Sequence, residues 1–296
     1  MKRKTINKTL RKKLNHWIEQ SGMDDKLQEK VRDNLLVSGG SIANLFMGEA
    51  PNDYDIYIQD IDVARELASF YCKPLHIGVL YGPEKEMYIE DYKKDRNASD
   101  YLFLDDKSAE AVRLRTLQPE QIKLEVNGGY EPTVDDPDKP YHVQFISPNA
   151  ITLSDDIQIV TRFTGPPEEI LANYDFIHAT NYFTFKEGVV VNLKAMECLL
   201  TRELRYQGSQ YPLTSVIRIK KFTNRGFTIN AGEILKMLYQ TSQLDLNNPD
   251  VLEEQLIGVD IAYFNTLINA LRNVSREKRA SEQYVFSMID RIFNDE

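Results

Sequence analysis

Apolar positions recur at helical spacing near both ends of the chain and alternate with polar positions between them. The first part predicts two helices, over about 8–19 and about 24–33, followed by the apolar run Leu35–Val37, which reaches Gly39 and Gly40. Residues 53–58, DYDIYI, alternate with a period of two and predict a strand. A helix is expected after this strand, over about 61–71.

Strand signals dominate the middle of the chain. We expect strands over about 75–81, 112–117, 122–126, 142–146, 157–163, 176–185 and 189–191, with turn residues between them. From about residue 193 the spacing becomes helical, as at Leu235, Leu238 and Tyr239. The pattern indicates an α+β fold in three parts: an N-terminal basic helical segment (1–34), a strand-rich domain (35–192) and a helical domain (193–296).

The composition narrows the class of protein. The chain has 296 residues, of which 42% are apolar and 27% charged, so it can bury a core and is neither disordered, collagen-like nor a coiled coil. No run of about 18 apolar residues predicts a membrane span, and the basic start lacks the apolar run of a signal peptide. We therefore expect a soluble, cytoplasmic protein. Cys72 and Cys198 are too few for a disulfide framework or a thiolate metal site, and we expect both in the core.

The positions of the charged residues are more informative about binding than the net charge. Lys and Arg number 36 against 45 Asp and Glu, and the net charge of −9 argues against a protein that coats nucleic acid over its whole surface. Two basic clusters stand out: residues 1–13 hold seven basic side chains and no acid, and Arg218, Lys220, Lys221 and Arg225 lie within eight residues. Each cluster can contact phosphates or can simply be a solvated face.

Residues 35–58, LLVSGGSIANLFMGEAPNDYDIYI, hold the most specific chemical pattern. Gly39 and Gly40 let the backbone approach a ligand closely. The helix expected after Ser41 turns its free N–H groups toward an anion such as phosphate. Asp53 and Asp55 are two residues apart on a strand, so they project from one face and can share Mg²⁺ ions. Carboxylates beside a phosphate cradle indicate metal-assisted phosphoryl or nucleotidyl transfer.

With eleven residues between Ser41 and Asp53, this pattern resembles the signature of the nucleotidyltransferase superfamily typified by DNA polymerase beta. The resemblance covers roughly residues 30–190 and implies a polymerase beta-like palm with a mixed sheet. It implies that Asp53 and Asp55 bind the Mg²⁺ or Mn²⁺ that carries an NTP. It also implies that Gly39, Gly40 and Ser41 hold the phosphates of that NTP.

The same resemblance implies a third carboxylate on a neighbouring strand, which binds the catalytic metal and helps to activate the attacking hydroxyl. Asp175, at the start of the strand expected over 176–185, is the first choice and Glu125 the second. A different registration takes Ile157–Val160 as the third strand and puts Gln158 in that position. An amide can bind a metal but brings no charge, so in that case metal affinity falls and catalysis is impaired.

Two further segments resemble known proteins. Residues 218–230, RIKKFTNRGFTIN, are similar to the arginine-containing segment of tRNA CCA-adding enzymes and poly(A) polymerases, although Gly226 stands where those proteins have an acid. This similarity supports phosphate contacts by Arg218, Lys220, Lys221 and Arg225. The segments YDFIHATNYF and RGFTINAGEILKM resemble bacteriophage-encoded nucleotidyltransferase-like proteins, which implies the host cytoplasm as the location.

The function implied is that of a metal-dependent nucleotidyltransferase, which moves a nucleoside monophosphate from an NTP to a hydroxyl and releases pyrophosphate. The basic clusters favour an RNA 3′ end, such as that of tRNA, as the acceptor; a protein side chain and a small molecule are alternatives. A second hypothesis is a catalytically silent nucleotide- or RNA-binding module of the same fold, a phage accessory protein acting on a host partner. NTP binding without turnover would distinguish this module from the enzyme.

Overall fold

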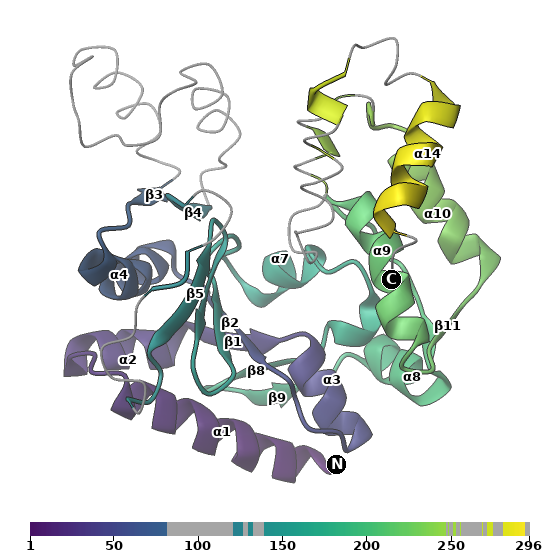
Figure 1. Cartoon of the computed structure of the whole chain (residues 1–296). Coiled ribbons are helices and arrows are strands. Elements are labelled where there is room, and N and C mark those ends of the chain that lie inside the picture. Colours follow the sequence, from purple (N-terminus) through teal and green to yellow (C-terminus); the bar gives the residue numbers. More distant parts are fainter. Residues whose placement is uncertain are drawn as a thin grey trace, which may run out of the picture. The chain divides into compact units, whose positions relative to one another are not determined.

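A computed structural model describes residues 1–81, 121–126, 130–132, 139–246, 248, 251–252, 255, 268, 271–274 and 281–293 (Figure 1). The chain divides into two compact units. The first comprises Met1–Leu171 and Ala179–Asn192, and the second comprises Ala172–His178 and Leu193–Glu296. The expected N-terminal segment 1–34 therefore lies within the first unit.

The first unit contains a seven-stranded sheet with the order β5-β6-β7-β2-β1-β8-β9. Neighbouring strands in it are antiparallel except β2 and β7, which are parallel. This mixed sheet, with helices packed against it, confirms the predicted α+β class. Its strands are β1 (Leu35–Ser38), β2 (Tyr54–Ile58), β5 (Val143–Ser147), β6 (Ala150–Leu153), β7 (Ile157–Val160), β8 (Tyr182–Thr184) and β9 (Gly188–Val190).

The predicted helices of the first unit are present, and α2 and α4 have side-chain caps at their starts. Asp24 accepts a hydrogen bond from the Leu27 N–H, and Asp60 accepts from the N–H groups of Asp62 and Val63. Such caps satisfy N–H groups that have no partner within the helix. These helices are α1 (Arg3–Gln20), α2 (Asp25–Asn34), α3 (Gly40–Met47) and α4 (Ile61–Cys72), which runs into the short 3₁₀ turn η1 (Lys73–Leu75). The sequence did not predict a further helix, α7 (Pro167–Ala172).

One face of the sheet supplies the core of the first unit. Alternate residues of the central strands, such as Val37, Ile56 and Ile159, belong to a single apolar cluster with buried side chains of α1, α2 and α4. Trp17 of α1, which is fully buried, also donates its indole N–H to the hydroxyl of Tyr71 in α4 over 3.0 Å. Because side chains alternate along a strand, the residues between these apolar positions lie on the opposite face of the sheet.

Several strand predictions differ from the structure. The strand expected over 75–81 begins as η1, and only β3 (Val79–Tyr81) is extended; it pairs with β4 (Ile122–Leu124) in a separate two-stranded sheet. The expectation over 112–117 falls outside the described residues. The long strand expected over 176–185 is wrong, because its first half forms the 3₁₀ turn η3 (Ile177–Ala179) and only β8 is a strand.

The second unit is mainly helical. Its described elements include α8 (Leu193–Thr201), β10 (Glu203–Leu204), α9 (Pro212–Thr223), β11 (Thr228–Ile229), α10 (Ala231–Thr241) and α14 (Glu282–Phe293). The short strands β10 and β11 pair in parallel. Cys198 in α8 is buried, as Cys72 is in α4, and both thiols are free. Burial raises the pKa of the Cys72 thiol to about 12, consistent with a core residue. Within the described residues, no helix combines the length and apolarity needed to cross a membrane.

Candidate functional site

The face of the seven-stranded sheet opposite the core carries a row of polar side chains. Directly paired residues point to the same face of a sheet, so cross-strand register identifies the row. Its members, one on each of four adjacent strands, are Ser38 (β1), Asp55 (β2), Gln158 (β7) and Thr152 (β6). Ser38 is fully buried and the other three are half-buried. We call these four residues the polar row.

The Gly39–Ser41 turn begins at one end of this row. Gly39 has φ 86° and ψ −150°, a conformation that requires glycine. Its N–H donates to the carbonyl of Ala179 over 3.1 Å. Gly40 opens α3, whose start has no side-chain cap and no acidic residue in its first turn. This turn has the features of an anion site: close backbone access and N–H groups at a helix start.

The hydroxyl groups of the turn are already used within the protein. Ser38 donates to the carbonyls of Ala179 and Asn181, at 3.2 and 3.0 Å, and Ser41 donates to the carbonyl of Ser38 over 3.4 Å. Ser41 is also buried. Any contact that Ser41 makes to a phosphate would therefore use its backbone N–H more readily than its hydroxyl.

A polar network of the buried Thr180 and Asn181 with the exposed Asn192 lies next to the turn, and the sequence patterns did not predict it. Asn181 accepts a bond from the N–H of Asn192 over 2.9 Å, and the Asn192 amide donates to the hydroxyl of Thr180 over 2.8 Å. These bonds tie the end of β9 to the segment that receives the hydrogen bonds of Ser38 and Gly39. The only sequence signal for this network is the polar pair Thr180-Asn181 between apolar stretches, which is common in turns.

Asp53 and Asp55 lie at the start of β2, at the same end of the sheet as the turn, because β1 and β2 are antiparallel. Asp53 is exposed and precedes the strand, whereas Asp55 is half-buried within it. Mg²⁺ is commonly held by one or two carboxylates together with substrate phosphates and water. Two carboxylates beside a turn that has the features of an anion site match that requirement for one Mg²⁺ ion.

The neighbour of Asp55 on the parallel strand is Gln158, as in the alternative registration. The amide nitrogen of Gln158 donates to the Thr152 hydroxyl over 3.4 Å, so its oxygen is the group left to face a ligand. Over the described ranges, no three or more His, Cys, Asp or Glu side chains gather closely enough to hold a metal. The polar row thus carries one carboxylate and one amide.

Neither of the two proposed third acids joins this row. Asp175 is not on a strand: it belongs to the second unit, at a bend, and its backbone carbonyl accepts a hydrogen bond from the Gln207 N–H. Its buried carboxylate accepts a bond from Arg218 at 3.0 Å, an ion pair that compensates the burial of the charge. Glu125 follows β4, and its side chain lies over Gly78 next to β3, outside the seven-stranded sheet.

The basic cluster expected to contact RNA is divided by the structure. Arg218 and Lys220 and Lys221 lie on α9, and Arg225 follows that helix. Arg218 pairs with Asp175, so two residues that were predicted to have separate roles bind each other. The carbonyl of Arg225 accepts a bond from the Arg202 guanidinium over 2.8 Å. Lys220 and Lys221 are exposed and remain the accessible part of the cluster.

His178 is a core residue of the second unit. Its ring packs against Phe222 and Phe227, with centroid distances of 4.7 and 5.0 Å. Its Nδ1 atom is buried and has no hydrogen-bond partner. Burial lowers the pKa of the imidazole to about 4; Asp175 opposes this shift and Arg225 adds to it. His178 is therefore neutral near pH 7.

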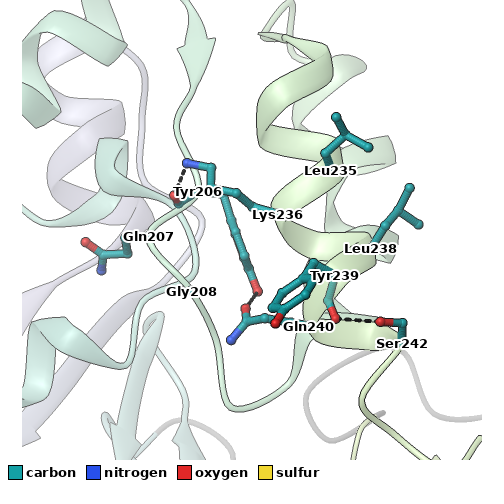
Figure 2. A pocket seen from close by; sticks show the side chains of 9 residues that line it. All are labelled: Tyr206, Gln207, Gly208, Leu235, Lys236, Leu238, Tyr239, Gln240 and Ser242. Atoms are coloured by element: carbon teal, nitrogen blue, oxygen red, sulfur yellow. Dashed lines mark hydrogen bonds between the residues drawn. The ribbon is translucent and has the colours of Figure 1, made fainter.

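An open groove on the second unit lies between α10 and the loop that follows β10. On one side it is lined by α10, on which Figure 2 shows Leu235, Leu238 and Tyr239. On the other side, Tyr206 donates its hydroxyl to Gln240 and accepts a bond from Lys236 at its carbonyl. The groove contains none of the residues predicted to bind nucleotide or metal.

The model of the Gabija anti-defense 2 family matches residues 8–202, about two thirds of the chain. The chain belongs to the Gabija anti-defense 2 family. A curated relative, the Gabija anti-defense 2 protein of Bacillus phage SPbetaL7, is 24% identical over 100 residues, which are 33% of this chain but only 25% of the relative.

The part matched by the Gabija anti-defense 2 family includes the Gly39–Ser41 turn, both aspartates and the polar row, whereas the cluster 218–225 lies beyond it. Solved structures similar to the chain include the CCA-adding enzyme of Bacillus stearothermophilus in complex with CTP, at 10% identity and a TM-score of 0.35, covering 93% of this chain and 64% of that one. The CCA-adding enzyme of Thermotoga maritima complexed with tRNA has 13% identity and a TM-score of 0.35, covering 95% and 61%.

Proposed function

We propose that the chain binds an NTP with Mg²⁺ at the Gly39–Ser41 turn and at Asp53 and Asp55, and that it transfers the nucleoside monophosphate to a hydroxyl acceptor. The observation that supports this best is the pairing of Ser38 with Asp55. This pairing puts the turn and the two carboxylates at the same end of adjacent strands, where one NTP–metal complex can contact both.

Each group has a separate task in this proposal. The turn and the first N–H groups of α3 hold the phosphates by charge-assisted hydrogen bonds. Asp53 and Asp55 would hold the Mg²⁺ ion, which supplies charge neutralisation at the phosphates when bound. The acceptor oxygen forms a bond to the α-phosphorus, the bond to pyrophosphate breaks, and the hydroxyl proton passes to solvent. Asp175 has no part in this step because Arg218 binds its carboxylate.

Gln158 supports a second candidate function, namely nucleotide binding with little or no turnover. Beside Asp55 it contributes an amide where a third anion would strengthen metal binding and favour loss of the hydroxyl proton. A site of this composition can still hold one metal–nucleotide complex. Measuring binding and transfer separately distinguishes the two functions.

We further propose that this nucleotide site is the means by which the chain acts against the Gabija defence that gives the family its name. The location would be the cytoplasm of a phage-infected host. An RNA 3′ end remains the favoured acceptor, because Lys220 and Lys221 are exposed cations on α9. A protein side chain of the host is the alternative acceptor.

The decisive variants are Asp53→Asn and Asp55→Asn. Each is expected to lower MgATP affinity on the order of tenfold or more, because a metal ligand is lost. Transfer of an α-labelled nucleotide to RNA or protein should disappear, as should protection of a phage from Gabija-carrying bacteria. Melting temperature should stay level or rise, since the two carboxylates repel each other without metal. Calorimetric titration measures the affinity, and a radiolabel assay with each of the NTPs measures the transfer.

The matched control is Asp33→Asn, which removes an exposed carboxylate on α2 outside the site. It should leave binding and transfer unchanged. Wild-type MgATP affinity in both site variants would refute the proposed site. Binding that depends on the aspartates, without transfer to any acceptor, would support the binding module instead of the enzyme.

A further inference from the structure

Helix α1 presents a row of lysines to solvent. Its other face is fixed by Ile6, Leu10 and Leu14, which are all 0% exposed and belong to the core. Lys4, Lys8 and Lys12 repeat every four residues on the outer side, and all three are exposed. With a rise of about 1.5 Å per residue, they form a stripe about 12 Å long. We call these three residues the lysine stripe.

Among the described residues, the lysine stripe has no paired carboxylate. Residues 1–18 contain no acid, and the first carboxylate of the chain, Glu19, pairs with Arg32. In the described part of the chain, no carboxylate pairs with a lysine of the stripe. Within the described residues of a protein whose net charge is −9, three cations without a carboxylate partner therefore stand in a line on one helix.

Two other basic residues of α1, Arg11 and Lys13, contact the side of the unit that carries the sheet. The Arg11 guanidinium donates to the carbonyl of Phe185 over 2.6 Å and lies above the rings of Phe183 and Phe185. Lys13 lies 5.6 Å from the ring centroid of Tyr54. These cation–π contacts account for two of the basic residues and leave the lysine stripe without a structural task.

We propose that the lysine stripe is a binding surface for the phosphate backbone of a single-stranded RNA. Protein–protein interfaces are depleted in lysine and need an apolar centre, whereas among the large apolar residues described in 1–20 only Met1 is exposed. Flexible lysine side chains in a line, without apolar neighbours, can bind the phosphates of a nucleic acid through charge alone, without recognising its base sequence. The surface is distinct from the nucleotide site, because it consists only of α1 side chains.

The test replaces Lys4, Lys8 and Lys12 together by Gln in the full chain. Binding of a fluorescent oligouridylate is measured by anisotropy over a series of salt concentrations. We expect the triple variant to bind on the order of tenfold more weakly at low salt, and its log–log salt slope to fall by about 2, or about 0.7 for each lost contact with a single strand. The loss should be equal for an oligoadenylate of the same length.

A control of equal charge replaces the exposed Lys26, Lys73 and Lys139 by Gln. Its RNA affinity and salt slope should match those of the wild type. An unchanged slope in the stripe variant, or an equal loss in the control, would overturn the proposal. Asp55→Asn should bind the oligouridylate normally while losing MgATP, so failure of the nucleotide site and failure of the RNA surface give different results. Circular dichroism checks that both lysine variants keep the fold.

Discussion

Gly39 and Gly40 are neighbours in one turn, yet the structure places different demands on them. Gly39 has a positive φ that disfavours any side chain, whereas Gly40 begins α3 in a helical conformation. A methyl group on Gly40 would meet no heavy atom within 4 Å. In the proposed site this open space receives the phosphates. Gly39 is therefore required for the fold of the turn, whereas Gly40 is required for binding.

Replacing each glycine by alanine tests these two roles. Gly39→Ala should lower the free energy of unfolding by about 1–3 kcal/mol, because the backbone conformation is strained for alanine. Gly40→Ala should leave stability unchanged or slightly raised, as alanine favours a helix, but should weaken MgATP binding. Urea unfolding and calorimetric titration measure the two effects. If Gly40→Ala binds MgATP as the wild type does, close backbone approach is not needed there.

Gln158 is the residue at which added charge is most informative. Gln158→Glu puts a carboxylate beside Asp55, and we expect affinity for Mn²⁺ to rise on the order of tenfold. Without metal, repulsion between the two carboxylates should lower the melting temperature. Titration followed by electron paramagnetic resonance measures the metal affinity. Gln158→Leu, which adds no charge, serves as the control, and equal Mn²⁺ affinity in the two variants would exclude Gln158 from the metal site.

At the scale of elements, local signals predicted the helices well. The helix expected over 61–71 is present as α4 at Ile61–Cys72, and the structure adds that Asp60 caps its start. The prediction of one strand over 176–185 was wrong because the apolar residues of this segment belong to two different units. Phe176 bridges to Tyr206 in the second unit, and only Tyr182–Thr184 pairs in the large sheet. Alternation of apolar residues cannot reveal which partner each half of a segment will find.

The candidate site shows the same division between local and long-range information. The turn and the Asp-x-Asp pair are contained in 24 residues, so their order along the chain already placed them on adjacent strands. The neighbour of Asp55 on β7 comes from about a hundred residues later in the sequence, so it depended on a strand registration. Both Asp175 and Gln158 lie in apolar surroundings in the sequence, and only the sheet register distinguishes them.

At the scale of the whole molecule, the core of the second unit contains a buried titratable residue, His178. His178 is 3% exposed and is surrounded by the aromatic rings of the second unit. Its unpartnered Nδ1 atom gives the cationic form no acceptor at that position. Folding of the second unit therefore requires neutral imidazole, whereas the unfolded chain can protonate it freely.

This difference predicts how stability depends on pH. The pKa of His178 is about 4 in the folded chain against 6.5 in the unfolded chain, so the unfolded state binds more protons between these values. Stability from neutral His178 is complete above pH 6.5 and decreases as the pH falls toward 4, by on the order of 3 kcal/mol in all. His178→Phe should remove this part of the acid sensitivity while preserving the aromatic packing. Urea unfolding of the second unit at about pH 7.5 and about pH 5 measures the effect, with His76→Asn, an exposed histidine, as the control. An equal loss of stability on acidification in wild type and His178→Phe would show that groups other than His178 cause it.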